Sequence, residues 1–320
     1  MPKTLMCDPE LLKKDLSGRI YIVTGANSGA GLATSSQLAH QGAHVVGACR
    51  RVDAGKRAFA KLASVRGSVE VIELDLASFA SIRRFAEMFM AKHDRLDGLI
   101  NNAGIMYAPE GKTEDGFESH FGVNYLGHFL LTELLLETLK ASAPSRIICV
   151  SSVLHIGTRN QVGEIYFDDL NFEKRQYDRN LAYTQSKLAI VLHALDLSQR
   201  LKGTGVSAFS IHPGWVRSNL ARHAIPGAVF IQNVLMRPFS RFLGTMSTYE
   251  GAQTTLHCLL DDDAPQHSGE YFSQNSILYP NKENRSGGWP MRSPNKYAND
   301  RELARKLYQV SLEIVGMSAN

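Results

Sequence analysis

The turn at residues 24–31, Thr-Gly-Ala-Asn-Ser-Gly-Ala-Gly, restricts the fold of this chain more than any other feature. It directly follows a β-branched run at residues 19–24 and opens a helical pattern that reaches about Gln41. Three glycines at this spacing, between a strand and a helix, are typical of a dinucleotide-binding unit. The first allows a tight turn, the second lets backbone approach a pyrophosphate, and the third lets the helix pack closely. A glycine-rich turn without a ligand is the alternative interpretation.

Strand-like and helix-like patterns then alternate along the chain, which predicts βαβ units and a parallel sheet covered on both faces. Right-handed crossovers make a doubly wound parallel sheet, the Rossmann fold of the α/β class, the expected architecture. The expected strands are residues 19–24, 44–49, 69–74, 96–101, 146–151, 206–211 and 270–273. The expected helices are residues 29–41, 52–65, 78–93, 114–140, 181–202, 248–260 and 300–315.

The length of 320 residues suits one large α/β domain. We expect an N-terminal tail over residues 1–16, the sheet domain over 17–275 and a C-terminal extension over 276–320. The extension ends in a helix that either packs back on the core or stays peripheral. A net charge of +4 is too small and too dispersed for a nucleic-acid surface, so we expect no nucleic-acid partner.

The cysteines and the N-terminus indicate the compartment. Cys7, Cys49, Cys149 and Cys258 lie far apart, without a CxxC pair or any Cys/His ligand spacing. The sequence therefore predicts neither a disulfide framework nor a metal site. The N-terminus has no apolar signal region, and no apolar run reaches the roughly 18 residues of a spanning helix. We expect a cytoplasmic protein without a transmembrane segment.

The end of the second expected strand distinguishes between dinucleotides. NAD-binding units commonly carry an acidic residue there, which takes the ribose 2′-hydroxyl. Here Cys49 is followed by Arg50 and Arg51, and the first carboxylate is that of Asp53. A guanidinium group matches phosphate oxygens well and would attract a 2′-phosphate, so the sequence favours NADP(H). Two solvated arginines at a strand end are the alternative.

A tyrosine and a lysine four residues apart form a second candidate site. Tyr183 and Lys187 lie on one face of an expected helix, because positions i and i+4 are neighbours there. A nearby cation favours the phenolate and lowers the pKa of the tyrosine. Ser151 and Ser152 end the fifth strand, at the rim where open α/β sheets bind ligands. For either serine, an ordinary strand-end hydroxyl is the alternative.

Together these motifs resemble the short-chain dehydrogenase/reductase family, over roughly residues 17–273. The motifs are the turn at 24–31, Asn-Asn-Ala-Gly at 101–104, the two serines, Tyr-Thr-Gln-Ser-Lys at 183–187 and His-Pro-Gly at 212–214. Within the family, the chain resembles the retinol dehydrogenase and WW-domain oxidoreductase branch. The segments at 48–51, 122–129 and 201–206, and the long insert containing Asp169, Leu170 and Asn171, carry this resemblance.

The resemblance implies roles for the catalytic residues. Tyr183 would be the general acid that protonates a carbonyl oxygen, or the base in the reverse direction. Lys187 would lower its pKa and bind the nicotinamide ribose. Ser152, rather than Ser151, would hold the substrate oxygen, and Asn124 would support a water-linked proton relay from Lys187.

The resemblance also implies the cofactor contacts. Asp75 and Leu76 would border the adenine, and residues 213–218 would cover the nicotinamide end. Ala30 stands where the family usually has isoleucine, which we expect to alter packing more than phosphate binding. The full set is Gly25, Asn27, Ser28, Gly29, Ala30, Gly31, Arg50, Arg51, Asp75, Leu76, Asn102, Ala103, Gly104, Tyr183, Lys187, Pro213, Gly214, Val216 and Ser218.

The function implied by the resemblance is hydride transfer between NADP(H) and a lipophilic carbonyl or alcohol, such as a retinoid, a steroid or another aldehyde or ketone. Residues 221–247 would form the substrate lid, whose apolar stretch at 225–243 suits a greasy ligand, peripheral contact with a membrane, or packing on a neighbouring helix. Homodimers through the two long helices are common in such a family. The alternative is a non-catalytic, dinucleotide-sensing scaffold that binds a protein partner.

Overall fold

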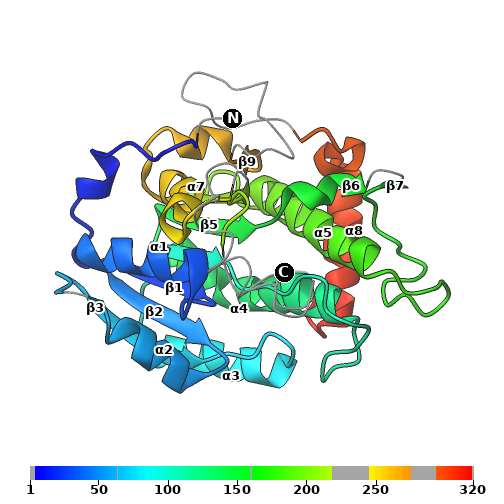
Figure 1. Ribbon diagram of the computed structural model, residues 1–320, viewed down its shortest axis with the longest axis horizontal. Helices are drawn as coiled ribbons and strands as arrows, with labels where there is room; N and C mark the ends of the chain where they lie inside the picture. The colour runs from blue at the N-terminus through cyan, green and yellow to red at the C-terminus, as the bar shows by residue number, and fades with distance from the viewer. Residues whose placement is uncertain (1–3, 63, 159–160, 218–244, 275–292, 319–320) are drawn as a thin grey trace.

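A seven-stranded parallel sheet forms the centre of the protein. The computed structural model describes residues 4–62, 64–158, 161–217, 245–274 and 293–318 (Figure 1). The strand order is β3-β2-β1-β4-β5-β8-β9, which confirms the doubly wound Rossmann-type sheet. The strands are β1 (Ile20–Thr24), β2 (His44–Cys49), β3 (Ser68–Glu73), β4 (Gly98–Asn101), β5 (Ser145–Val150), β8 (Val206–His212) and β9 (Tyr271–Ser273). A small antiparallel pair, β6 (Gly157–Thr158) and β7 (Gln161–Val162), lies outside this sheet.

Helices cover both faces of the sheet. They are α1 (Gly29–His40), α2 (Val52–Phe59), α3 (Phe79–Met90), α4 (Gly127–Ala141), α5 (Arg179–Arg200), α7 (Thr248–Leu260) and α8 (Arg301–Ile314). A π-helix, η2 (Phe121–Leu126), leads directly into α4, and short 3₁₀ turns are η1 (Leu11–Lys13), η3 (Val153–Ile156), η6 (Ala264–His267) and η7 (Lys296–Asn299). One hydrophobic cluster joins the sheet to α3, α4, α5 and α8, and a second joins it to α1, α2 and α7.

Strand residues alternate between these two clusters. Ile147 belongs to the cluster under α4 and α5, and its neighbour Ile148 belongs to the cluster under α1 and α7. Val45 and Val46 divide in the same way, on opposite sides of β2. Side chains of a strand point alternately to opposite faces, so a strand buried on both faces needs apolar residues at nearly every position. This explains why the strands read as continuous apolar runs.

The crossover pattern positions the functional site. β1 pairs with β2 on one side and with β4 on the other, so the chain winds outward in both directions from β1. Ligands of open α/β sheets bind in the crevice outside the carboxyl ends of the strands at such a switch point. In this chain, the glycine turn after β1 lies at that switch point.

The helix expected from residue 114 begins later, and that expectation is wrong for residues 114–118. Gly116 has a φ of 86°, and the amide of Thr113 donates to the carbonyl of Phe117, which closes a tight turn. Lys112 and Glu118 pair in an antiparallel bridge across it. The Asp-Gly dipeptide at 115–116 is a turn signal that overrides the helical pattern here.

The expected second helix also ends early, at Phe59 rather than residue 65. The amides of Lys61 and Leu62 donate to Ala58 and Phe59, respectively, which tightens the last turn into i→i+3 hydrogen bonds. Such bonds satisfy the terminal carbonyls and stop the helix. The other helices and strands match their expected ranges to within a few residues.

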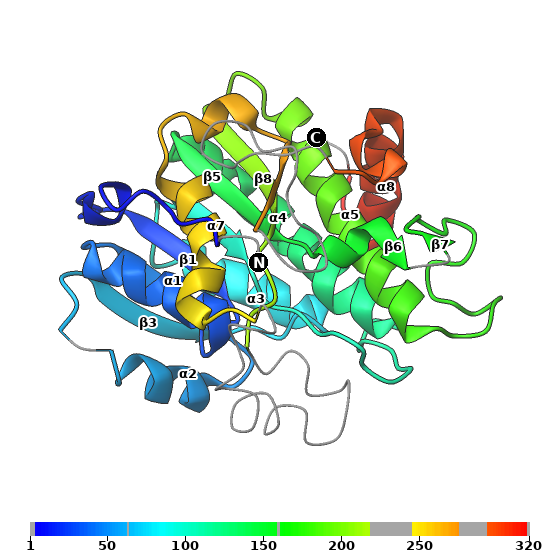
Figure 2. The same cartoon turned by 45° about the horizontal axis from the view of Figure 1, so that its top comes forward.

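The end regions of the chain pack on the domain. α8 runs beside α5 (Figure 2), and its apolar face joins the larger hydrophobic cluster, so the final helix packs back on the core. Near the N-terminus, Cys7 is buried and its amide donates to the Gln253 side chain on α7. Among the described residues, no helix combines the length and hydropathy that crossing a bilayer requires. Most of the expected lid over 221–247 lies outside the described residues, which resume at 245.

The docking of α8 gives a stability prediction. Leu307 is 1% exposed, and replacing it with alanine would leave a cavity against α5. We expect Leu307→Ala to lower the free energy of unfolding by about 2–4 kcal/mol. Urea unfolding followed by circular dichroism measures the change. Gln309→Ala, at an exposed position of the same helix, is the control; equal stabilities of the two variants would contradict the docking argument.

Candidate active site

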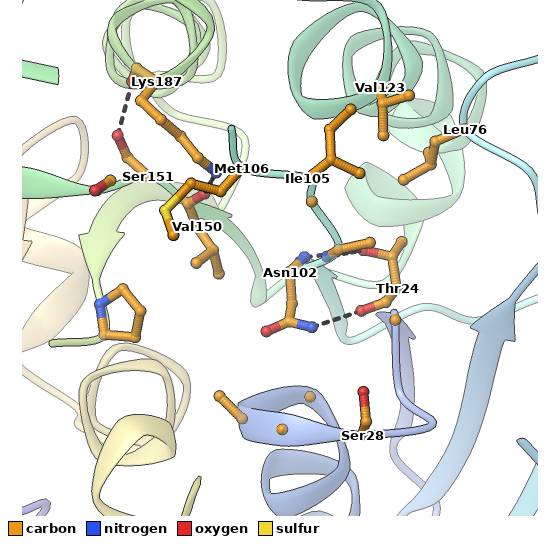
Figure 3. Close-up of a pocket in the computed structure, with 18 of the residues that line it drawn as sticks. Thr24, Ser28, Leu76, Asn102, Ile105, Met106, Val123, Val150, Ser151 and Lys187 are labelled. Carbon is orange, nitrogen blue, oxygen red and sulfur yellow. Dashed lines mark hydrogen bonds between the residues drawn. The ribbon is translucent and has the colours of Figure 1, made fainter. Parts of the chain in front are cut away.

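A cavity of about 630 Å³ opens at the carboxyl ends of the central strands (Figure 3). Its walls come from the turn after β1, the ends of β2, β4, β5 and β8, and one face of α5. Most residues expected from the sequence line it: Gly25, Asn27, Ser28, Gly29, Ala30, Gly31, Arg50, Arg51, Asp75, Leu76, Asn102, Ala103, Gly104, Ser151, Ser152, Tyr183, Lys187, Pro213, Gly214 and Val216. Asn124 lies behind the wall, and Ser218 lies outside the described residues.

The turn after β1 requires glycine at three of its positions. A Cβ on Gly31 would lie 2.5 Å from Asn102 Nδ2 and 2.7 Å from the carbonyl oxygen of Gly25. Gly25 and Gly29 both have positive φ, at 66° and 61°. Ser28, the N-cap of α1, makes no side-chain bond to the helix, so the first-turn N–H groups keep their capacity for an anionic ligand.

This packing predicts the effect of a single methyl group. We expect Gly31→Ala to lower the free energy of unfolding by about 1–3 kcal/mol, because backbone and Asn102 must move apart. The same movement displaces the N-terminus of α1, so the affinity for a dinucleotide falls as well. Urea unfolding and NADPH titration measure the two effects. Ser36→Ala, farther along α1, is the control, and a Gly31→Ala variant as stable as that control would contradict the packing argument.

A hydrogen-bonded chain holds the loop after β4 against the turn after β1. The Thr24 hydroxyl oxygen accepts from the amides of Asn102 and Ala103, both at 2.9 Å, while the Asn102 side chain donates to the Thr24 carbonyl (Figure 3). His128 Nδ1 faces the carbonyl of Asn124 at 2.9 Å and must donate to it, so Nε2 accepts from Thr24. Burial lowers the pKa of His128 to about 4, which keeps the ring neutral.

The two arginines lie at the rim of the cavity beyond β2. Both Arg50 and Arg51 are exposed, and both line the cavity. Within the described residues neither forms an ion pair, so both guanidinium groups are available to a ligand. Asp75 follows the neighbouring strand β3. Its carboxylate already accepts a hydrogen bond from the amide of Ala77, at 2.9 Å.

Tyr183, Lys187 and Ser152 meet at the opposite end of the cavity. Lys187 Nζ donates to the Val150 carbonyl at 3.0 Å and lies 5.7 Å from the centre of the Tyr183 ring. Ser151 is used structurally, since its hydroxyl donates to the Lys187 carbonyl at 2.7 Å (Figure 3). Ser152 is therefore the serine whose hydroxyl faces Tyr183.

Burial controls the charge states of this group. It raises the pKa of Tyr183 above its usual range, and the Ser152 hydroxyl partly opposes this by hydrogen bonding. Burial also lowers the pKa of Lys187 to about 7. The expected lowering of the tyrosine pKa by the lysine is not seen, because the same low-dielectric surroundings disfavour both charged forms. The raised pKa favours the neutral phenol, which is the protonation state of an acid.

Asn124 occupies a position behind the cavity, in the π-helix. Its side-chain oxygen accepts from the Ile105 amide at 2.8 Å, and its nitrogen donates to the Ile105 carbonyl and to Ser186, both at 3.0 Å. A Cβ on Gly104 would lie 3.0 Å from this side chain and 3.6 Å from Lys187 Nζ. Asn124 thus fixes the strand-end loop that faces Lys187. Its part in a proton relay stays a prediction.

A set of apolar residues in the cavity wall was missed from the sequence. It comprises Ile105, Met106, Tyr107, Val123, Leu154 and Trp215. The Tyr107 ring lies 5.8 Å from the Tyr183 ring, and Trp215 is 46% exposed. The available signal was that Ile105, Met106 and Tyr107 directly follow the Asn-Asn-Ala-Gly motif, so they must lie beside the same strand end.

Comparisons with known proteins identify the family. The family model described as short chain dehydrogenase matches residues 19–166. Human retinol dehydrogenase 12 is 45% identical over 304 residues, which cover 94% of this chain and 88% of that protein. Human retinol dehydrogenase 13 is 42% identical over 313 residues, covering 96% and 87% of the two chains.

Solved structures have the same architecture. An uncharacterised protein from Mycobacterium paratuberculosis is 33% identical, with a TM-score of 0.71 over 95% of this chain and 96% of that one. A complex of Pseudomonas aeruginosa RhlG with NADP is 26% identical, with a TM-score of 0.62 over 81% and 95%. The chain therefore belongs to the short-chain dehydrogenase/reductase family of oxidoreductases, in its retinol dehydrogenase-like branch.

Proposed function

We propose that this oxidoreductase uses NADP(H) to interconvert a lipophilic carbonyl compound and its alcohol, with Tyr183 as general acid and base. The observation that carries the proposal is the meeting of Tyr183, Ser152 and Lys187 in the cavity that the glycine turn opens. A scaffold that only sensed a dinucleotide would have no need of a buried phenol at this position.

The cavity fits a dinucleotide at several points along its length. At the turn, added Cβ atoms on Gly25 and Gly31 would collide with Ala103, Asn102 or backbone, so the close packing that shapes this end of the cavity requires glycines. At the rim, Arg50 and Arg51 supply the positive charge that a 2′-phosphate requires. RhlG, a structural relative, is known as a complex with NADP.

The remaining assigned residues complete the proposed binding site. Asp75 and Leu76 border the adenine, and Asn27, Ser28, Gly29 and Ala30 follow the diphosphate. Asn102, Ala103 and Gly104 line the middle of the cofactor, and Pro213, Gly214 and Val216 cover the nicotinamide end, where Lys187 would hold the ribose. When bound, NADP(H) would donate or accept the hydride.

The proposed proton chemistry belongs to the side chains. During carbonyl reduction, the neutral phenol of Tyr183 donates its proton to the substrate oxygen, while the Ser152 hydroxyl holds that oxygen in place. In the reverse direction, the Tyr183 phenolate accepts the alcohol proton. Lys187 exchanges that proton onward, because its lowered pKa of about 7 lets it exist in both charge states at neutral pH. Asn124 would support a water-linked relay from Lys187.

The lipophilic substrate class rests on the apolar residues of the cavity wall. Ile105, Met106, Leu154 and Trp215 line the same cavity as Tyr183, and the Tyr107 ring lies 5.8 Å from the Tyr183 ring. Such a wall gives a hydrocarbon chain or ring system a water-free surface and offers few polar partners. The similarity to retinol dehydrogenases 12 and 13 supports retinoids among the candidates, beside steroids and other aldehydes and ketones.

A carbonyl panel tests the proposal. Purified protein is mixed with NADPH or NADH and with all-trans-retinal, a steroid ketone, a medium-chain aldehyde or a small polar aldehyde, and the nicotinamide absorbance is followed. We expect turnover with NADPH, favouring the lipophilic substrates. Tight binding of NADPH without turnover of any substrate would instead favour the dinucleotide-sensing scaffold.

A further inference from the structure

Three potential metal ligands gather at the edge of the sheet opposite the cavity. His44 is the first residue of β2, Glu70 lies in β3, and His93 follows the end of α3. This edge holds the amino ends of the parallel strands, whereas the cavity lies at their carboxyl ends. The cluster therefore lies outside the site that the proposed function uses.

The distances within the cluster are close to those of a metal site. Glu70 Oε1 lies 3.4 Å from His44 Nε2 and 2.6 Å from His93 Nε2, and the candidate ligand atoms are all within 4.8 Å of one another. Ligands at about 2.1 Å from a tetrahedral zinc ion are separated by about 3.4 Å. The His44–Glu70 distance already matches, and His93 needs to move by less than about 1 Å, well within the reach of a side-chain rotation.

Neighbouring groups orient the two imidazoles toward Glu70. The His44 Nδ1 atom is 2.7 Å from the Ser68 hydroxyl, so Nε2 is the nitrogen directed at the carboxylate. The His93 ring packs between Phe89 and His44, with ring centres 5.0 and 5.1 Å away. Hydrogen bonds to the second ring nitrogen are the usual means by which proteins orient metal-binding histidines.

We propose that His44, Glu70 and His93 bind one divalent transition-metal ion of the Zn²⁺ class. Two imidazoles and one carboxylate are a known zinc ligand set, in which water completes the tetrahedron. Their side chains are 26%, 24% and 16% exposed, so an ion can enter and a water ligand has room. The bound ion would connect β2, β3 and the end of α3, and would thereby stabilise the fold without taking part in turnover.

Lys92 modulates the proposed site. Its ammonium group lies 3.3 Å from Glu70 Oε2, the carboxylate oxygen that does not contact the histidines. Oε1 is thus left for the metal, while the positive charge of Lys92 opposes a second cation nearby. The ligands are 26 and 23 residues apart in the chain, which is why ligand spacing in the sequence predicted no metal site.

Calorimetry on the tag-free, chelator-treated protein tests this site with Zn²⁺ alone. We expect one ion to bind per chain and the melting temperature to rise. His44→Gln and His93→Gln each weaken Zn²⁺ binding by at least about tenfold, and Ser68→Ala weakens it by about tenfold because His44 loses its orienting partner. Lys92→Gln binds Zn²⁺ more tightly than the wild type.

His40→Gln is the matched control, because His40 is an exposed histidine of α1 outside the cluster. It is expected to bind Zn²⁺ like the wild type. Circular dichroism and NADPH binding verify that each variant is folded. If the ligand variants do not fold, Co²⁺ is added to the wild type and its visible absorption spectrum is recorded. A spectrum of tetrahedral coordination by nitrogen and oxygen supports the proposed site. An octahedral spectrum, absence of binding, or equal binding by wild type and folded ligand variants would overturn the proposal.

Discussion

Tyr183→Phe is expected to lower kcat for carbonyl reduction by about 10²–10⁴-fold, the contribution typical of a positioned general acid. The substitution removes only the hydroxyl, and the ring stays packed in the buried position that α5 gives it. The dissociation constant for NADPH is therefore expected to stay close to that of the wild type. Steady-state kinetics with the best substrate of the panel, together with fluorescence titration of NADPH, measures the two quantities.

Tyr107→Phe is the matched control for this experiment. Its ring lies 5.8 Å from that of Tyr183 and lines the same cavity, but its hydroxyl has no role in the proposed proton transfer. We expect this variant to change KM more than kcat, because it borders the substrate. Unchanged turnover in Tyr183→Phe, or an equal loss of kcat in both variants, would exclude Tyr183 as the specific acid.

Replacing both Arg50 and Arg51 by alanine is expected to weaken NADPH binding by about 10–100-fold, which corresponds to losing one or two charge-assisted hydrogen bonds. NADH lacks the 2′-phosphate, so its affinity is expected to change little. The single variant Arg50→Ala is expected to show a smaller loss in the same direction. Parallel titrations with both dinucleotides, at low and at high salt, separate the phosphate contact from general electrostatics.

Arg57→Ala is the control for net charge, since Arg57 is an exposed arginine of α2 that does not line the cavity. It removes one positive charge from the same region without touching the proposed phosphate site. If the Arg50/Arg51 variant lost affinity for NADH and NADPH equally, the arginines would act on the dinucleotide as a whole. Arg50 and Arg51 would then not form a 2′-phosphate site.

The parts of the fold that the sequence predicted correctly are those set by local patterns. The strand at 44–49 and the helix at 248–260 match their expected bounds, because apolar periodicity and the Ser247–Glu250 capping box are contained within a few residues. The errors fall where two local signals compete. At Asp115 and Gly116, a turn signal lies inside a helix-like pattern. The chain forms the turn, which the bridge between Lys112 and Glu118 closes.

The candidate site divides in the same way. The glycine turn and the Tyr183–Lys187 pair were visible because their members are neighbours in the chain, and the strand order brings both to one cavity. The sequence could not show that the Ser151 hydroxyl donates a hydrogen bond to the Lys187 carbonyl, whereas the Ser152 hydroxyl lies beside Tyr183. Nor could it show that burial would outweigh the lysine and raise the pKa of the tyrosine.

The sequence by itself therefore determined the doubly wound sheet, the family and most of the residues that line the cavity. Only the tertiary structure decided the charge states and the hydrogen-bond partners of the side chains in the site. Desolvation and hydrogen bonding depend on elements that are distant in the chain. The chain from Asn124 through His128 to Thr24 spans two helical segments and a strand. The cluster of His44, Glu70 and His93 likewise exists only because β2, β3 and the end of α3 meet at one edge of the sheet.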